Sequence, residues 1–158
     1  MLADIDANDD KTFSFVCQEH NWKRTAQRRA VFGYLCGNRD HPTVETIWRG
    51  VKVTMPDISL DSIYRILDAF SEAGLIRRLE GAKVIRYDSD TQSHEHFVCT
   101  QCERMFDLGS LEIERVIKSG CEFGRIETVE LIARGTCRLC LEKQESAGSK
   151  TVRIPKRA

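Results

Sequence analysis

Two Cys-x-x-Cys pairs, Cys99/Cys102 and Cys137/Cys140, constrain this chain more than any other feature. Residues 1–11 hold four aspartates and no basic signal-peptide region, so we expect a cytoplasmic protein, outside the compartments that maintain disulfides. Two such pairs then predict a tetrahedral four-thiolate site with zinc as its usual metal. A redox dithiol and buried thiols without a metal are the alternatives.

The composition is that of a folded globular chain, with 158 residues, 41% hydrophobic and 30% charged. No apolar run approaches the roughly 18 residues that span a bilayer, so no membrane partner is expected. The formal net charge of zero is unevenly spread, at +3 over residues 11–90 and −3 over residues 91–145. The acidic residues 1–10 and the basic residues 146–158 balance each other, and both are expected to be flexible tails.

Residues 11–87 are predicted to be a winged helix-turn-helix domain. Thr25, Thr43 and Ser59 each precede apolar residues at helical spacing, as N-caps do. The first helix should end at Gly37, the second before Pro56 and the third before Gly74. Two strand-like segments, residues 75–79 and 83–87, then flank Glu80-Gly81-Ala82 as a hairpin. The helix beginning after Ser59 would be the recognition helix.

The face of that helix turned away from its apolar stripe points to DNA. Tyr64 and Arg65 lie side by side on it, near Ser62; arginine can bind guanine and a tyrosine ring can pack on a thymine methyl group. An ordinary solvated face is the alternative. Further basic residues of the domain could neutralise phosphates: Lys23, Arg24, Arg28, Arg29, Arg77, Arg78 and Arg86.

A polar hinge, residues 88–92, leads into a small α/β domain over residues 93–145. Short strands are expected near residues 97–98 and 105–108, a helix over 110–119 and a strand over 125–133. This domain is too small to bury much core, so a structural zinc would contribute to its stability. The fold class is therefore α+β.

A second group of ligand-type residues surrounds the hinge. His94 and His96 are two apart, so in a strand both imidazoles face one side. Asp88, Asp107 and His41 complete a mixed nitrogen and oxygen set. Such a set suits Mn²⁺ or Fe²⁺, with zinc a competitor on affinity.

Several motifs together resemble the ferric uptake regulator (Fur) superfamily: Thr25-Ala26-Gln27-Arg28-Arg29, His41-Pro42-Thr43, Tyr64-Arg65, Tyr87-Asp88, His94-Glu95-His96-Phe97-Val98-Cys99 and Gly135-Thr136-Cys137. The resemblance covers about residues 15–142. It implies a homodimeric repressor of operator DNA, whose C-terminal domain dimerises and holds a four-cysteine zinc. A regulatory metal at the hinge would set the DNA-binding arrangement.

The resemblance also implies the regulatory ligands His41, Asp88, His94, His96 and Asp107. Aspartate at both carboxylate positions is similar to the peroxide-sensing (PerR-type) branch, in which bound Fe²⁺ leads to oxidation of a ligand histidine. His41 and His94 would be the oxidisable positions. An iron- or manganese-responsive repressor without peroxide sensing is the alternative. Ser93 and Val129 replace histidines of a third metal site, which is expected to be missing.

Two rival functions remain. A zinc deaminase needs His-x-Glu and Pro-Cys-x-x-Cys, whereas here Glu95 follows His94 directly and no proline precedes Cys99. A closed four-thiolate site leaves no position for a substrate, so we expect no enzyme and no small-molecule substrate. A repressor that uses its Cys pairs as a redox switch would eject zinc on oxidation.

Overall fold

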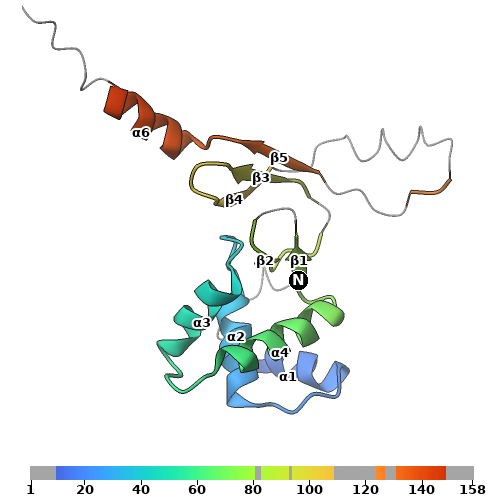
Figure 1. Ribbon diagram of the computed structural model, residues 1–158. Helices are drawn as coiled ribbons and strands as arrows, with labels where there is room; N and C mark the ends of the chain where they lie inside the picture. The colour runs from blue at the N-terminus through green and yellow to red at the C-terminus, as the bar shows by residue number, and fades with distance from the viewer. Residues whose placement is uncertain (1–9, 81–82, 93, 109–123, 127–130, 149–158) are drawn as a thin grey trace, which may run out of the picture. The chain divides into compact units, whose positions relative to one another are not determined.

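The computed structural model describes residues 10–80, 83–92, 94–108, 124–126 and 131–148. The chain divides into two compact units, Met1–His94 and Glu95–Ala158 (Figure 1). The first is mainly helical and the second is built on a sheet, which confirms the α+β class. Within the described part of the chain, no helix is long and apolar enough to cross a membrane.

Four helices form the body of the first unit: α1 (Asp10–Glu19), α2 (Ala26–Leu35), α3 (Val44–Lys52) and α4 (Leu60–Glu72). The sequence predicted the last three and missed α1. This helix is short and mostly polar, and its buried face consists of Phe13, Val16 and Cys17. Three apolar residues over one turn are too few to show a helical period.

The three predicted N-caps are confirmed. The hydroxyl oxygens of Thr25, Thr43 and Ser59 each accept the backbone N–H three residues further on, at 3.2, 3.3 and 3.1 Å. Each bond satisfies a donor that the first turn of a helix leaves without an intrahelical partner. At the other end of α4, Gly74 has a φ of +69°, the left-handed conformation that favours glycine after a helix.

The core of the first unit draws on all four helices. Fully buried Leu, Ile and Phe side chains each stabilise the fold by about 1.5–3 kcal/mol relative to exposure. Trp48 Nε1 also donates to the Ile58 carbonyl over 3.0 Å, which fixes α3 to the turn before α4. Burial of one face of α4 leaves Tyr64 and Arg65 on its outer face. The most buried large side chains are Val31, Phe32, Leu35, Ile47, Val51, Ile63, Leu67 and Phe70.

A two-stranded antiparallel ribbon follows the helices. Strand β1 (Arg77–Leu79) pairs with β2 (Arg86–Asp88), with Arg77 opposite Asp88. The ribbon confirms the predicted wing, although each strand is shorter than its apolar segment. Asp88, predicted to begin the hinge, is the last residue of β2 and is fixed by the ladder.

The second unit contains a three-stranded sheet in the order β4-β3-β5. Strand β3 (His96–Cys99) runs antiparallel to β4 (Met105–Asp107) and parallel to β5 (Ile132–Gly135). Helix α6 (Arg138–Gly148) follows β5. The sheet brings the end of β3 next to the end of β5, so the segments that carry the two Cys pairs meet.

Two sequence predictions for this unit need correction. The last strand was expected from residue 125, but the described residues 124–126 and 131 are not in a strand and β5 begins at Ile132. The flexible tail was expected from Ser146, which instead lies in α6, where its Oγ donates to the Glu142 carbonyl over 2.9 Å. The sequence suggested a tail because Gly148 and Pro155 are residues that interrupt regular structure. The helix expected over 110–119 lies outside the described residues.

Candidate metal centres

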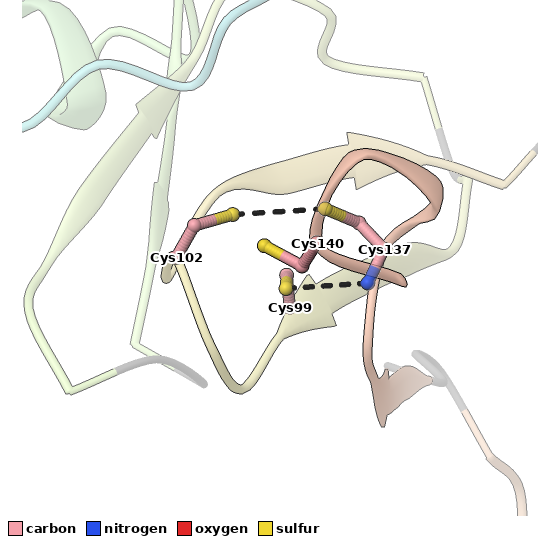
Figure 2. A group of neighbouring side chains, drawn as sticks. All are labelled: Cys99, Cys102, Cys137 and Cys140. Atoms are coloured by element: carbon pink, nitrogen blue, oxygen red, sulfur yellow. Dashed lines mark hydrogen bonds between the residues drawn. The ribbon is translucent and has the colours of Figure 1, made fainter. Parts of the chain in front are cut away.

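The four cysteines of the two Cys-x-x-Cys pairs lie together in the second unit (Figure 2). Their four sulfur atoms lie within 4.8 Å of one another, and Cys102 Sγ is 3.7 Å from Cys137 Sγ. Zinc–thiolate bonds of about 2.3 Å place the sulfurs of a tetrahedron about 3.8 Å apart. The cluster therefore fits a structural zinc, as the sequence predicted.

Backbone geometry explains why these side chains converge. At the end of β3, Glu103 N donates to the Cys99 carbonyl and Cys99 N donates to the Arg104 carbonyl, both at 2.9 Å. Glu103 takes a φ of +58° to close this turn. Cys137 immediately precedes α6 and Cys140 lies in its first turn, where the helix dipole favours negative charge. Each pair is thus held by a tight local turn.

The environment of the cysteines favours a thiolate. Burial raises the pKa of the Cys99 thiol, but backbone N–H groups of Cys102, Cys137 and Gln101 outweigh burial and lower it to about 6. Burial and hydrogen bonds with neighbouring thiols raise the pKa of Cys140 to about 12. The hydrogen bond from the Arg104 backbone also lowers the pKa of Cys102, so the cluster favours the charged form of two thiols and disfavours that of Cys140. Full deprotonation of the four thiols therefore calls for a cation among the sulfurs.

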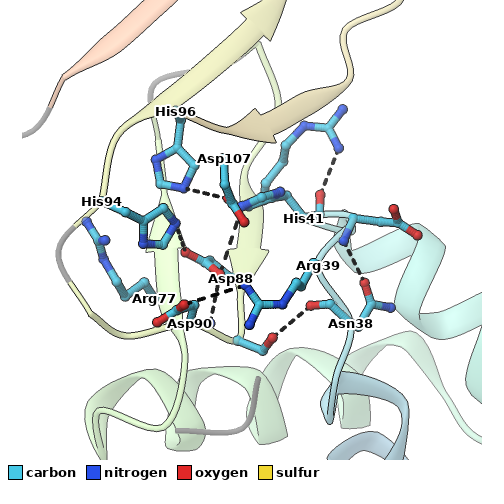
Figure 3. A network of polar contacts seen from close by, with 12 residues as sticks. Asn38, Arg39, His41, Arg77, Asp88, Asp90, His94, His96 and Asp107 are labelled. Atoms are coloured by element: carbon cyan, nitrogen blue, oxygen red, sulfur yellow. Dashed lines mark hydrogen bonds and ion pairs between the residues drawn. The ribbon is translucent and has the colours of Figure 1, made fainter. Parts of the chain in front are cut away.

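In the first unit, the Asp88 carboxylate lies between two imidazoles (Figure 3). His94 Nε2 is 3.2 Å from Asp88 Oδ2, and His41 Nε2 is 3.9 Å from Asp88 Oδ1. Asp88 and His41 are buried, with exposed fractions of 3% and 1%. A buried carboxylate facing two ring nitrogens needs a positive charge, supplied either by a proton or by a metal ion.

Neighbouring groups orient the side chains of His94 and Asp88. His94 Nδ1 lies 2.9 Å from the Gln92 carbonyl oxygen, and a bond donated there leaves Nε2 with its lone pair toward Asp88. Asp88 Oδ1 accepts the Asp90 N–H at 2.8 Å. Such contacts are typical of metal ligands, whose second nitrogen or oxygen is held by a neighbouring group.

Two residues of β2 fix the backbone around His41. The φ of His41 is +48°, a conformation that non-glycine residues rarely adopt. The Arg86 guanidinium donates to the His41 carbonyl at 2.8 Å, and Tyr87 N donates to the Pro42 carbonyl at 3.0 Å. A strained residue held from two sides indicates a functional position.

The other two predicted ligands form a pair in the second unit. His96 and Asp107 are directly opposite in the β3–β4 ladder, and His96 Nε2 is 3.9 Å from Asp107 Oδ1 (Figure 3). The first unit therefore holds two imidazoles and a carboxylate of the predicted set, and the second unit holds one of each. This donor chemistry fits Fe²⁺ or Mn²⁺.

The predicted DNA-contact residues of α4 lie on its outer face. Tyr64 is 42% exposed, and the Arg65 side chain is 80% exposed and paired with Asp61 at 2.9 Å. Ser62 has its N–H and hydroxyl at the Ser59 cap, so its side chain serves the helix start.

The predicted phosphate contacts fall into two groups. Lys23 and Arg24 are exposed, and Arg24 pairs with Asp10 at 3.2 Å. Arg28 instead lies 4.9 Å over the Trp22 ring and donates to the Lys23 carbonyl, and Arg77 donates to the Gln92 carbonyl at 3.3 Å. Both of these guanidiniums bind the protein itself.

Sequence reasoning missed the groups that orient the ligands. The Gln92 carbonyl and the Asp90 N–H are backbone atoms, which every residue has, so no residue pattern reveals them. The positive φ of His41 had no signal in the sequence, because a residue before proline is expected to be extended with a negative φ.

Comparison with known proteins agrees with this architecture. The model of the ferric uptake regulator family matches residues 19–132. The peroxide-responsive repressor PerR of Staphylococcus aureus (strain USA300) is 31% identical over 123 residues, which cover 75% of this chain and 82% of that protein.

Solved structures share the fold. A zinc-bound manganese uptake regulator matches with a TM-score of 0.66 at 25% identity, covering 80% of this chain and 98% of that one. The Helicobacter pylori ferric uptake regulator, described as having three functional metal binding sites, matches with a TM-score of 0.70 at 22% identity, covering 83% and 90% of the two chains. With a family model that matches well over half of its length, the chain belongs to the ferric uptake regulator family of metal-responsive regulators.

Proposed function

We propose that this protein is a cytoplasmic, homodimeric transcriptional repressor that binds double-stranded operator DNA when a regulatory metal is bound. One Fe²⁺ or Mn²⁺ ion would be held by the ligands of both units: His41, Asp88, His94, His96 and Asp107. The observation that carries the proposal is the buried Asp88 carboxylate between the Nε2 atoms of His41 and His94. The zinc at the four cysteines would be structural, and no enzymatic activity is proposed.

The mechanism is a linkage between metal and DNA. His41, Asp88 and His94 belong to the unit that contains the helix-turn-helix, and His96 and Asp107 belong to the unit that contains the zinc cysteines. An ion bound by both sets favours one arrangement of the two units, and shifts the equilibrium by its preference for that arrangement. A coupling of about 2–3 kcal/mol changes DNA affinity by about 30- to 150-fold.

DNA would be read by the outer face of α4. Tyr64 and Arg65 are exposed there, and the Arg65 guanidinium can exchange its Asp61 contact for a base edge. Lys23 and Arg24, exposed at the start of α2, would contact phosphates. The net charge of +3 over residues 11–90 supplies little non-specific attraction, so metal-free protein should bind DNA poorly at physiological salt.

The signal is proposed to be peroxide. Both regulatory carboxylates are aspartates, and the S. aureus relative that is 31% identical to this chain is a peroxide-responsive repressor. Bound Fe²⁺ would activate hydrogen peroxide, and the net reaction would insert one of its oxygens into a C–H bond of the His41 or His94 ring and release water. Loss of a ligand would then weaken metal binding and release DNA.

One experiment tests the regulatory site. Zinc-loaded His96→Ala should lose Mn²⁺-dependent operator binding, measured by fluorescence anisotropy. His20→Ala, which removes a histidine at the end of α1, is the matched control and should behave like the wild type. Unchanged, metal-dependent binding by His96→Ala would refute the proposed site.

A second experiment separates peroxide sensing from iron or manganese sensing, which the similarity to a manganese uptake regulator keeps as the alternative. Peptide mass analysis should find one added oxygen on a peptide with His41 or His94 after peroxide with Fe²⁺, and none with Mn²⁺. Unmodified histidines with Fe²⁺ would favour the alternative. Retained zinc would exclude the redox switch at the cysteines.

A further inference from the structure

Each proposed metal ligand of the first unit is linked to an arginine, either directly or through one neighbouring residue. Arg86 donates to the carbonyl of His41 at 2.8 Å. Arg39 pairs with Asp90 at 3.9 Å, and the Asp90 N–H is bound by Asp88. The sequence suggested phosphate contacts for the arginines of the wing, yet here two of them are directed at backbone atoms around the ligands.

The link from Arg77 to His94, through the Gln92 carbonyl, is the most specific of the three. The Gln92 carbonyl oxygen lies 3.3 Å from Arg77 Nη1 and 2.9 Å from His94 Nδ1, so one oxygen serves both groups. The ring orientation of His94 depends on where that oxygen lies. Its position depends in turn on the loop after β2, which Arg77 fixes from strand β1.

The ribbon register explains how Arg77 reaches this loop. Arg77 is directly opposite Asp88 in the β1–β2 ladder. From Asp88 the chain folds back through two side-chain turns, in which Asp90 N binds Asp88 Oδ1 at 2.8 Å and Gln92 N binds Asp90 Oδ1 at 3.0 Å. The Arg77 guanidinium then closes this segment against β1 by donating to the Gln92 carbonyl.

We propose that Arg77 is a positioning residue for the regulatory metal, acting through the Gln92 carbonyl on His94, and that it is not a DNA contact. This inference rests on the proposed function, because it takes His94 as a ligand. Loss of a group that orients a metal ligand typically weakens metal affinity by about 10- to 100-fold. The expected loss of metal affinity in Arg77→Ala is opposite in sign to the effect of charge alone, because removal of a nearby positive charge would by itself tighten cation binding.

The neighbouring Arg78 provides a matched control. It lies on the opposite face of the same strand, is exposed, and pairs with Glu80 at 3.4 Å. Arg78→Ala therefore removes the same charge from the same strand without touching the Gln92 carbonyl.

The test is Mn²⁺ binding to the zinc-loaded protein without DNA, followed by electron paramagnetic resonance of free Mn²⁺. Arg77→Ala should weaken binding by about 10- to 100-fold, Arg77→Lys should weaken it less because lysine can also donate to the carbonyl, and Arg78→Ala should not weaken it. Operator affinity of Arg77→Ala at saturating Mn²⁺, and its salt dependence, should match the wild type.

Wild-type Mn²⁺ affinity in Arg77→Ala would overturn the inference, as would equal weakening by Arg77→Ala and Arg78→Ala. A lower DNA affinity at saturating Mn²⁺, with a salt slope reduced by about one, would make Arg77 a phosphate contact instead. A His94→Ala variant distinguishes failure of the proposed regulatory site from failure of the proposed role of Arg77. If His94→Ala binds Mn²⁺ like the wild type, the proposed regulatory site fails. If His94→Ala loses Mn²⁺ binding but Arg77→Ala keeps the wild-type Mn²⁺ affinity, only the role of Arg77 fails.

Discussion

The backbone N–H of Cys137 donates to Sγ of Cys99 over 3.3 Å, and so joins two cysteine pairs that are far apart in the sequence. The bond places the start of α6 against the end of β3 before any metal is considered. Because N–H groups favour the charged form of Cys99, the turn both shapes the site and prepares one ligand for zinc.

Removal of one zinc ligand should unfold the second unit. Cys137→Ser should bind less than about one tenth of the wild-type zinc, measured by elemental analysis. The loss of several kcal/mol should lower Tm by more than about 10 °C, at about 2–4 °C per kcal/mol. Cys36→Ala, in the core of the first unit, is the control and should keep its zinc. Full zinc occupancy in Cys137→Ser would contradict a four-cysteine site.

The turn after Cys102 contains a strained residue that can be relieved. Glu103 has a φ of +58°, which costs a non-glycine residue about 1–2 kcal/mol. Glu103→Gly should therefore raise the Tm of the zinc-loaded protein by about 2–8 °C, at about 2–4 °C per kcal/mol. Gly74→Ala, at a φ of +69°, makes the reverse change and should lower it. A lower Tm for Glu103→Gly would show that its side chain stabilises the turn.

The contact of α3 with the Tyr34 ring requires a glycine. A Cβ at Gly50 would lie 2.0 Å from Tyr34 Cε2, so Gly50→Ala should destabilise the protein by about 1–3 kcal/mol, measured by urea unfolding. In a Tyr34→Ala background the same change should be neutral or stabilising, since alanine favours a helix over glycine. If Gly50→Ala destabilised the wild type and the Tyr34→Ala variant equally, a clash with the Tyr34 ring would be excluded.

These examples show which parts of the molecule could be predicted from the sequence. Caps such as Thr25 and the paired cysteines are local signals, because the residue type itself makes the bond. Helix α1 lacked such a signal, and the end of α6 was obscured by Gly148 and Pro155. The group that orients His94 is the carbonyl of Gln92, whose role depends on the tertiary path of the loop and on no side chain.

The start of α1 should reduce non-specific DNA binding. Asp10 pairs with Arg24 at 3.2 Å and Arg29 at 3.5 Å, so it neutralises charge beside the proposed phosphate contacts. Asp10→Asn should raise affinity for a non-specific duplex and steepen its salt dependence by about one phosphate contact. Glu19→Gln, at the other end of α1, loses the same charge and is the control. Equal affinities of the two variants would show that only net charge matters.

If the regulatory metal and operator DNA stabilise the same state, each must tighten binding of the other. The Mn²⁺ affinity of the zinc-loaded dimer is measured by electron paramagnetic resonance with and without a duplex selected from genomic fragments in the presence of Mn²⁺. DNA should tighten Mn²⁺ binding by the same overall factor by which Mn²⁺ tightens DNA binding, about 30- to 150-fold. The same Mn²⁺ affinity with and without DNA would contradict this linkage.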